Sequence, residues 1–78
     1  MKTIVLLDDI FFEKLGDDYI LQSKHSERYC LVNSDAHSMI SMLPQMTETE
    51  KDELYRSNID FWDTLAANGF VLVEDCMS

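Results

Sequence analysis

Two cysteines and two histidines are the side chains of this chain best suited to catalysis or metal binding. Cys30 and Cys76 lie far outside a C-x-x-C spacing, and His25 and His37 do not form an H-x-x-x-H pair, so neither residue type predicts a metal site. Cys30 lies within an apolar run, where a free cysteine usually packs as a small buried side chain. We therefore expect reduced thiols in a cytoplasmic protein, and histidines at the surface.

Paired carboxylates are the next candidates, and they occur at positions 8–9 and 17–18. Both aspartate pairs border apolar runs, where aspartate commonly ends a strand or stabilises a turn by bonding its own backbone. The two glycines, Gly16 and Gly69, are too far apart to form a phosphate-binding loop. We predict that the protein is not an enzyme, has no catalytic residue and uses no cofactor.

Length and composition indicate one small globular domain. The 78 residues predict a single domain, 1–78, with its core within about 3–73, and a hydrophobic content of 46% excludes a disordered chain. The longest apolar run, residues 4–7, is far shorter than the roughly 20 residues that span a bilayer. The first residues do not resemble a signal peptide, which agrees with a cytoplasmic location.

The charge of the chain is strongly negative. Six basic residues against fifteen acidic ones give a net charge of -9, which repels nucleic acid and anionic membranes. Such a surface attracts a partner rich in lysine or arginine. An acidic excess is also an ordinary way for a protein to stay soluble, so charge alone leaves both interpretations open.

The first half of the chain predicts strands. Residues 3–7 are β-branched and aliphatic, and residues 10–15 resume an extended apolar pattern. Gly16 opens a turn, after which residues 18–32 form a hairpin with a polar tip. Its return strand is residues 28–32.

The second half predicts three short helices. Asn33, Ser34 and Asp35 are capping residues for a helix that Pro44 ends. Residues 47–50 fit a capping box for a second helix, which is nearly all polar and is expected to pack weakly. A third helix is expected over residues 59–68, capped by Ser57 and Asn58 and ended by Gly69. Phe61 and Leu65 share one face of this helix, and Ile59, Trp62 and Ala66 adjoin that face. Residues 70–73 are compatible with a short final strand.

The return strand carries apolar side chains on both faces. Tyr29 and Leu31 point to one side, whereas Cys30 and Val32 point to the other. If this strand forms a sheet edge, its free backbone groups can accept an added peptide strand. The alternative is that the third helix covers the strand entirely.

The order of these elements resembles the precursor-peptide recognition domains of ribosomally synthesised, post-translationally modified peptide pathways. That family includes the D-type peptide chaperone of pyrroloquinoline quinone biosynthesis and the leader-binding proteins of lasso-peptide pathways. The matching pieces are residues 19–21, residues 29–36, and Phe61, Leu65, Gly69 and Phe70. The resemblance implies a small winged-helix-like α+β domain, with an N-terminal antiparallel sheet of three to four strands followed by three short helices.

The resemblance also implies a non-catalytic function. Such a domain holds the leader region of a precursor peptide as an added strand between its third strand and third helix, and delivers it to a modifying enzyme or leader peptidase. The residues implied for peptide binding are Arg28, Tyr29, Cys30, Leu31, Val32, Asp60, Phe61, Asp63, Thr64 and Ala67. Asp60 and Asp63 would meet basic residues of the leader, although a merely solvated helix face is an equal interpretation, and Phe61 also fits a core position.

Two other functions remain as alternatives. A winged-helix transcriptional regulator shares the implied topology, but residues 48–53 and 60–63 are acidic where a recognition helix is expected to be basic. An acidic protein–protein adaptor is compatible with the charge. An acyl carrier protein is disfavoured because the first half of the chain predicts strands and Ser34-Asp35 reverses the order of an attachment site.

Overall fold

The computed structural model describes residues 1–75, so Cys76 lies outside the described part of the chain. The chain folds as α+β, as predicted. Its strands pair antiparallel, and its helices lie in the second half of the sequence. The elements in chain order are β1 (Lys2–Leu6), β2 (Ile10–Leu15), β3 (Asp18–Ser23), β4 (Tyr29–Val32), α1 (Ser34–Met42), the 3-10 turn η1 (Leu43–Gln45), α2 (Glu48–Ser57), α3 (Ile59–Ala67) and β5 (Val71–Asp75).

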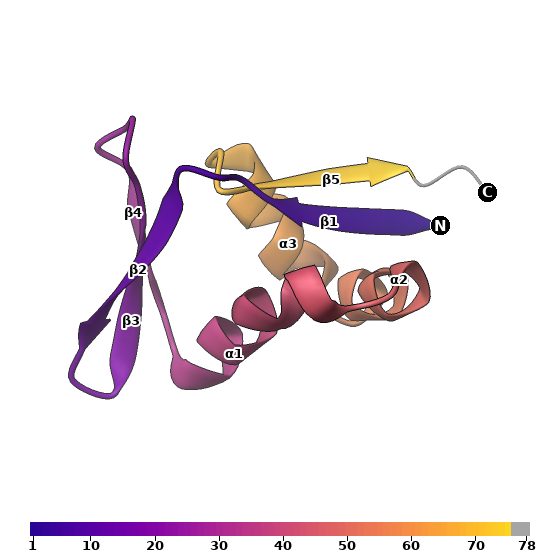
Figure 1. Ribbon diagram of the computed structural model, residues 1–78, viewed down its shortest axis with the longest axis horizontal. Coiled ribbons are helices and arrows are strands. Elements are labelled where there is room, and N and C mark those ends of the chain that lie inside the picture. Colours follow the sequence, from indigo (N-terminus) through magenta and orange to yellow (C-terminus); the bar gives the residue numbers. More distant parts are fainter. Residues whose placement is uncertain (76–78) are drawn as a thin grey trace.

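The strands form two sheets, whereas the sequence predicted one N-terminal sheet of three to four strands. β2, β3 and β4 make a three-stranded antiparallel meander, and β1 pairs with β5 in a separate two-stranded ribbon. Figure 1 shows the meander at one end of the molecule, with the helices on one side of it. The division is a long-range effect, because the C-terminal strand returns to pair with the first strand and holds it apart from the hairpin.

Two helix starts follow the predicted capping residues. The Asn33 side chain accepts a hydrogen bond from the backbone N–H of Ala36 at 2.8 Å. Thr47 and Glu50 form a reciprocal capping box, with the two bonds at 3.0 and 3.2 Å. These bonds satisfy backbone donors that an α-helix leaves free at its start.

The ends of the helices depart slightly from the prediction. α1 ends at Met42, and Pro44 lies within the 3-10 turn that follows. Asn58 does begin α3, but its side-chain amide donates to Leu54 O of α2 at 3.4 Å and does not cap α3. Asn58 both ends α2 and begins α3, and its side-chain amide donates a hydrogen bond to a backbone carbonyl of α2.

Gly69 ends α3 in the predicted place. Its φ of 81° lies in the left-handed region, its N–H donates to Ala66 O, and the N–H of Phe70 donates to Leu65 O. This pair of bonds is the Schellman arrangement that glycine favours. It turns the chain directly into β5.

One continuous core joins both sheets to the helices. Trp62 is fully buried and lies among side chains from every layer of the fold. The largest buried members of this core are Trp62, Phe70, Ile4, Leu21, Ile40, Leu43, Leu65 and Val71. Ile59, which the sequence placed beside the helix face of Phe61 and Leu65, is 45% exposed.

The second helix makes a polar contact with β1 that the sequence did not predict. Asp52 is only 8% exposed and accepts a hydrogen bond from the backbone N–H of Lys2 at 2.8 Å. Arg56 Nε lies 3.1 Å from the same carboxylate. The Asp52 carboxylate thus ties α2 to β1, and Leu54 and Tyr55 of α2 are partly buried against the core.

The two histidines differ in environment. His25 is exposed, as predicted. His37 is half-buried, with its ring stacked on Tyr19 at a centroid distance of 3.7 Å and an interplanar angle of 6°. Phe12 meets the His37 ring edge-on at 4.5 Å, so this histidine packs α1 against the meander.

Candidate functional site

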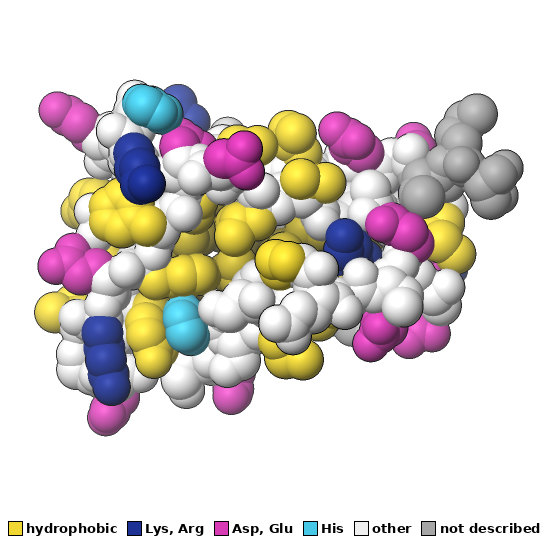
Figure 2. Space-filling view, in the orientation of Figure 1, with side chains coloured by type: hydrophobic (Ala, Val, Ile, Leu, Met, Phe, Trp, Pro, Cys, Tyr) yellow, Lys and Arg dark blue, Asp and Glu magenta, His cyan; other side chains and the backbone are white. Residues whose placement is uncertain are grey.

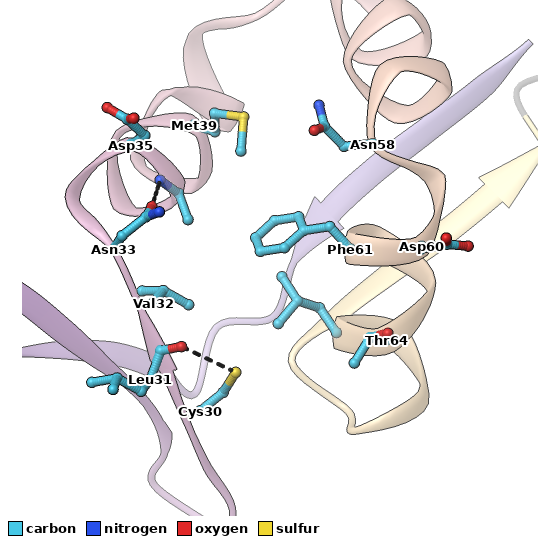
Figure 3. Close-up of a pocket in the computed structure, with 12 residues that line it drawn as sticks. Cys30, Leu31, Val32, Asn33, Asp35, Met39, Asn58, Asp60, Phe61 and Thr64 are labelled. Atoms are coloured by element: carbon cyan, nitrogen blue, oxygen red, sulfur yellow. Dashed lines mark hydrogen bonds between the residues drawn. The ribbon is translucent and has the colours of Figure 1, made fainter.

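A groove of about 540 Å³ runs between β4 and α3, with α1 at one end (Figure 3). Hydrophobic side chains gather between the meander and the helices, and acidic, basic and histidine side chains border them (Figure 2). The groove is lined by residues of β4, of α1 with its cap, and of α3 with its cap: Cys30, Leu31, Val32, Asn33, Asp35, Ala36, Met39, Asn58, Asp60, Phe61, Thr64 and Leu65.

The strand wall of the groove is a sheet edge. β4 is the last strand of the β2-β3-β4 order, and no other strand of residues 1–75 pairs with its second edge. The Leu31 side chain points away from α3 in Figure 3, whereas its carbonyl oxygen accepts a weak contact from Cys30 Sγ at 3.8 Å. Leu31 therefore lines the groove with its backbone.

The floor of the groove is apolar. Val32, Ala36 and Leu65 are buried at 5%, 7% and 2% exposure. The Phe61 ring projects into the groove and meets the Trp62 ring edge-on at 4.9 Å (Figure 3). Phe61 thus joins the core and lines the site, which unites the two predicted interpretations of this residue.

Cys30 is half-buried and lines the groove. The sequence predicted a buried cysteine, but α3 does not close over β4 at this position, so the side chain keeps part of its surface accessible. Val32, two residues further along β4, is buried on the same face of the strand. The cover that α3 gives to β4 is therefore incomplete.

The rim of the groove is polar and partly acidic. Asp35 lies in the first turn of α1 and Asp60 in the first turn of α3, where the helix dipole favours a negative charge. Both carboxylates point outward in Figure 3. Within residues 1–75 neither has a hydrogen bond or ion pair, so both are available to a basic group that approaches the rim.

Six of the ten predicted binding residues line this groove: Cys30, Leu31, Val32, Asp60, Phe61 and Thr64. Arg28 does not, because its Nη1 donates to Asn68 O at 3.2 Å and ties the hairpin loop to the end of α3. Tyr29 is 74% exposed on the opposite face of the meander.

The remaining two predicted residues, Asp63 and Ala67, also lie outside the groove. Asp63 accepts a hydrogen bond from the Tyr55 hydroxyl at 2.9 Å and so faces α2. This bond raises the pKa of Tyr55, because the phenol donates to a carboxylate. Ala67 is exposed on α3 but does not line the groove.

The lining residues that were not predicted come mainly from α1 and from the two helix caps. They are Asn33, Asp35, Ala36, Met39, Asn58 and Leu65. A signal for Ala36 and Met39 was present, because they occupy one helical face at i and i+3. How closely that face approaches β4 is a tertiary property that this spacing does not reveal.

Comparisons with family models, with curated proteins and with solved structures found no match to this chain. Within residues 1–75, no helix is long and apolar enough to cross a membrane. The same residues contain no group of three side chains placed to bind a metal ion. The groove between β4 and α3 is therefore the feature of the molecule that bears most directly on function.

Proposed function

We propose that this protein binds an extended peptide as an additional strand on β4 and presents it to a modifying enzyme or leader peptidase. The observation that carries the proposal is the free edge of β4, which opens onto an apolar groove of about 540 Å³. Exposed edge strands bind peptides through main-chain hydrogen bonds. The arrangement of the meander beside three helices supports a winged-helix-like description of the domain. We further propose that the bound peptide is the leader region of a precursor peptide.

The backbone of β4 indicates which residues would bind the peptide. In an antiparallel ladder the N–H and C=O of one residue point to the same side, and this side alternates along the strand. The Leu31 carbonyl faces the groove, so Tyr29, two positions earlier, is expected to present its backbone groups to the same side. Cys30 and Val32 would use theirs to pair with β3.

The walls of the groove determine the kind of peptide that fits. Alternate side chains of an added strand would point inward, where Met39, Phe61 and Leu65 offer apolar contacts. A lysine or arginine at the rim would meet Asp35 or Asp60, neither of which has a partner within residues 1–75. The expected leader therefore has apolar residues at alternate positions and a basic residue nearby.

Titration with synthetic leader peptides tests this proposal. The Trp62 ring touches Phe61 at a centroid distance of 4.9 Å, so a peptide that moves Phe61 should change the fluorescence of the single tryptophan. We expect saturable binding with a dissociation constant in the micromolar range or below. A scrambled peptide of equal composition is the control, and equal responses to both peptides would contradict the proposal.

A further inference from the structure

The outer face of the meander carries a second set of apolar side chains. Residues directly opposite each other on paired strands point to the same face, and faces alternate along each strand. The pairs Ile20 with Leu31 and Gln22 with Tyr29 therefore share one face. The pairings of β2 with β3 place Phe11, Glu13, Leu15 and Asp18 on that face as well.

These apolar residues are accessible. Tyr29 is 74% exposed, Leu31 59%, Leu15 57% and Phe11 38%. The helices lie on the other side of the meander (Figure 1), where Phe12 and Leu21 pack into the core. Single exposed apolar residues are common, but several on one sheet face mark an interaction surface.

The charges on this outer face have one sign. Its ionisable side chains within the paired strands, apart from the Tyr29 phenol, are Glu13 and Asp18, whereas Lys14 belongs to the inner face through its pairing with Tyr19. The whole chain carries a net charge of -9. A second copy would place acidic side chains against acidic side chains, so the charges favour a basic partner over self-association.

The dimensions of the face fit a single helix. Neighbouring strands lie about 4.8 Å apart, so β2 and β4 are separated by about 10 Å, which matches the diameter of an α-helix with its side chains. A sheet with one apolar face is commonly covered by a helix with an apolar stripe.

We propose that the outer face of β2, β3 and β4 binds an amphipathic helix of a partner protein, with lysine or arginine beside its apolar stripe. This surface is distinct from the groove, so the proposal holds whether or not the groove binds a peptide. β4 belongs to both sites, with Cys30 and Val32 toward the groove and Tyr29 and Leu31 toward the outer face. The two sites can therefore be occupied together.

A model peptide tests the surface directly. An amphipathic helix of leucine and lysine is titrated into the 15N-labelled protein, and a peptide with the same leucine pattern and glutamate in place of lysine is the control. We expect amide shifts concentrated at Phe11, Leu15, Ile20, Tyr29 and Leu31 with the lysine peptide, and none with the glutamate peptide. Shifts confined to the groove or to β5 would overturn the proposal, as would the absence of shifts.

Paired variants make the test specific. L15S combined with Y29S should weaken binding of the lysine peptide by about tenfold or more, because both side chains lie at the proposed contact. L72S is the matched control, since Leu72 is 45% exposed but lies on the β1–β5 ribbon. Equal affinities of the two variants, at unchanged circular dichroism, would overturn the assignment of this face.

Two further results separate the possible occupants and sites. Sedimentation equilibrium should show a monomer, and a dimer that dissociates in the L15S, Y29S variant would show that a second copy is the occupant and overturn the proposal. The lysine peptide should still bind when F61A weakens leader binding. Leader binding that fails while the lysine peptide binds normally contradicts the groove function and supports the outer face, and the reverse result overturns only the outer face.

Discussion

β1 and β4 both lie at the edge of a sheet, but α2 contacts the edge of β1, whereas the edge of β4 opens onto the groove of about 540 Å³. At β1, the backbone N–H of Lys2 donates to Asp52 of α2 at 2.8 Å, so the neighbouring helix satisfies this edge. At β4, the Leu31 carbonyl points toward α3 in Figure 3 and accepts a weak contact from Cys30 Sγ at 3.8 Å. Free strand edges promote aggregation and are usually covered. This contrast supports the proposal that the open edge of β4 binds a peptide.

The largest expected effect separates the two faces of β4. V32D would place a carboxylate at a site that is 5% exposed, and should lower the free energy of unfolding by about 3 kcal/mol or more, or prevent folding. L31D, at a site that is 59% exposed, should change it by less than about 0.5 kcal/mol. Urea denaturation followed by circular dichroism measures both. Similar losses in the two variants would contradict the assignment of the faces.

A smaller effect concerns the groove side of that comparison. F61A removes the ring that projects between α3 and β4, and should weaken leader binding by about tenfold, because truncation of a buried aromatic contact commonly has this effect. I59A is a matched control on the same helix, since Ile59 is 45% exposed and does not line the groove. Calorimetric titration of both variants gives the answer, and equal affinities would argue against the groove.

The smallest expected effect concerns the covered edge of β1. The hydrogen bond from the Lys2 N–H, aided by Arg56, lowers the pKa of Asp52 below its ordinary value of 3.8. A lowered pKa in the folded state adds stability that is present above the unfolded pKa and is lost as the pH falls through the folded pKa. D52N should therefore be less stable than the natural protein at neutral pH, and the difference should shrink in acid. Thermal denaturation from pH 7 to about pH 3 tests this, and a difference independent of pH would contradict the role of the charge.

Local features of the fold could be predicted from the sequence. The Asn33 cap and the Thr47 and Glu50 capping box depend on residues within one helical turn, so their residue types identify them. The hairpin of β3 and β4 likewise follows from apolar runs beside a polar turn. The pairing of β1 with β5 joins the two ends of the described chain, and no local pattern indicates it.

The candidate site was predictable to the same extent. Alternation along β4 separated Cys30 and Val32 from Tyr29 and Leu31, which the structure confirms. The positions of Arg28 and Asp63 depend on partners from other elements, Asn68 O and the Tyr55 hydroxyl, and these partners turn both side chains away from the groove. Helix periodicity predicts which side chains share a face of a helix, but it does not predict how closely that face approaches another element.

The most direct test of the open edge is a proline at Leu31. Proline lacks the N–H that Leu31 is expected to offer to a peptide, and an edge strand tolerates proline where this group does not pair within the sheet. Cys30 is a poorer position, because its backbone groups are expected to point to β3 when those of its neighbour Leu31 point to the groove. L31A keeps the N–H and serves as the matched control.

The measurement is calorimetric titration of a leader peptide into L31P and L31A, with folding checked by circular dichroism. The account predicts that L31P folds and binds at least about tenfold more weakly than L31A, because a main-chain hydrogen bond is lost. Equal binding by two folded variants would contradict strand addition at β4.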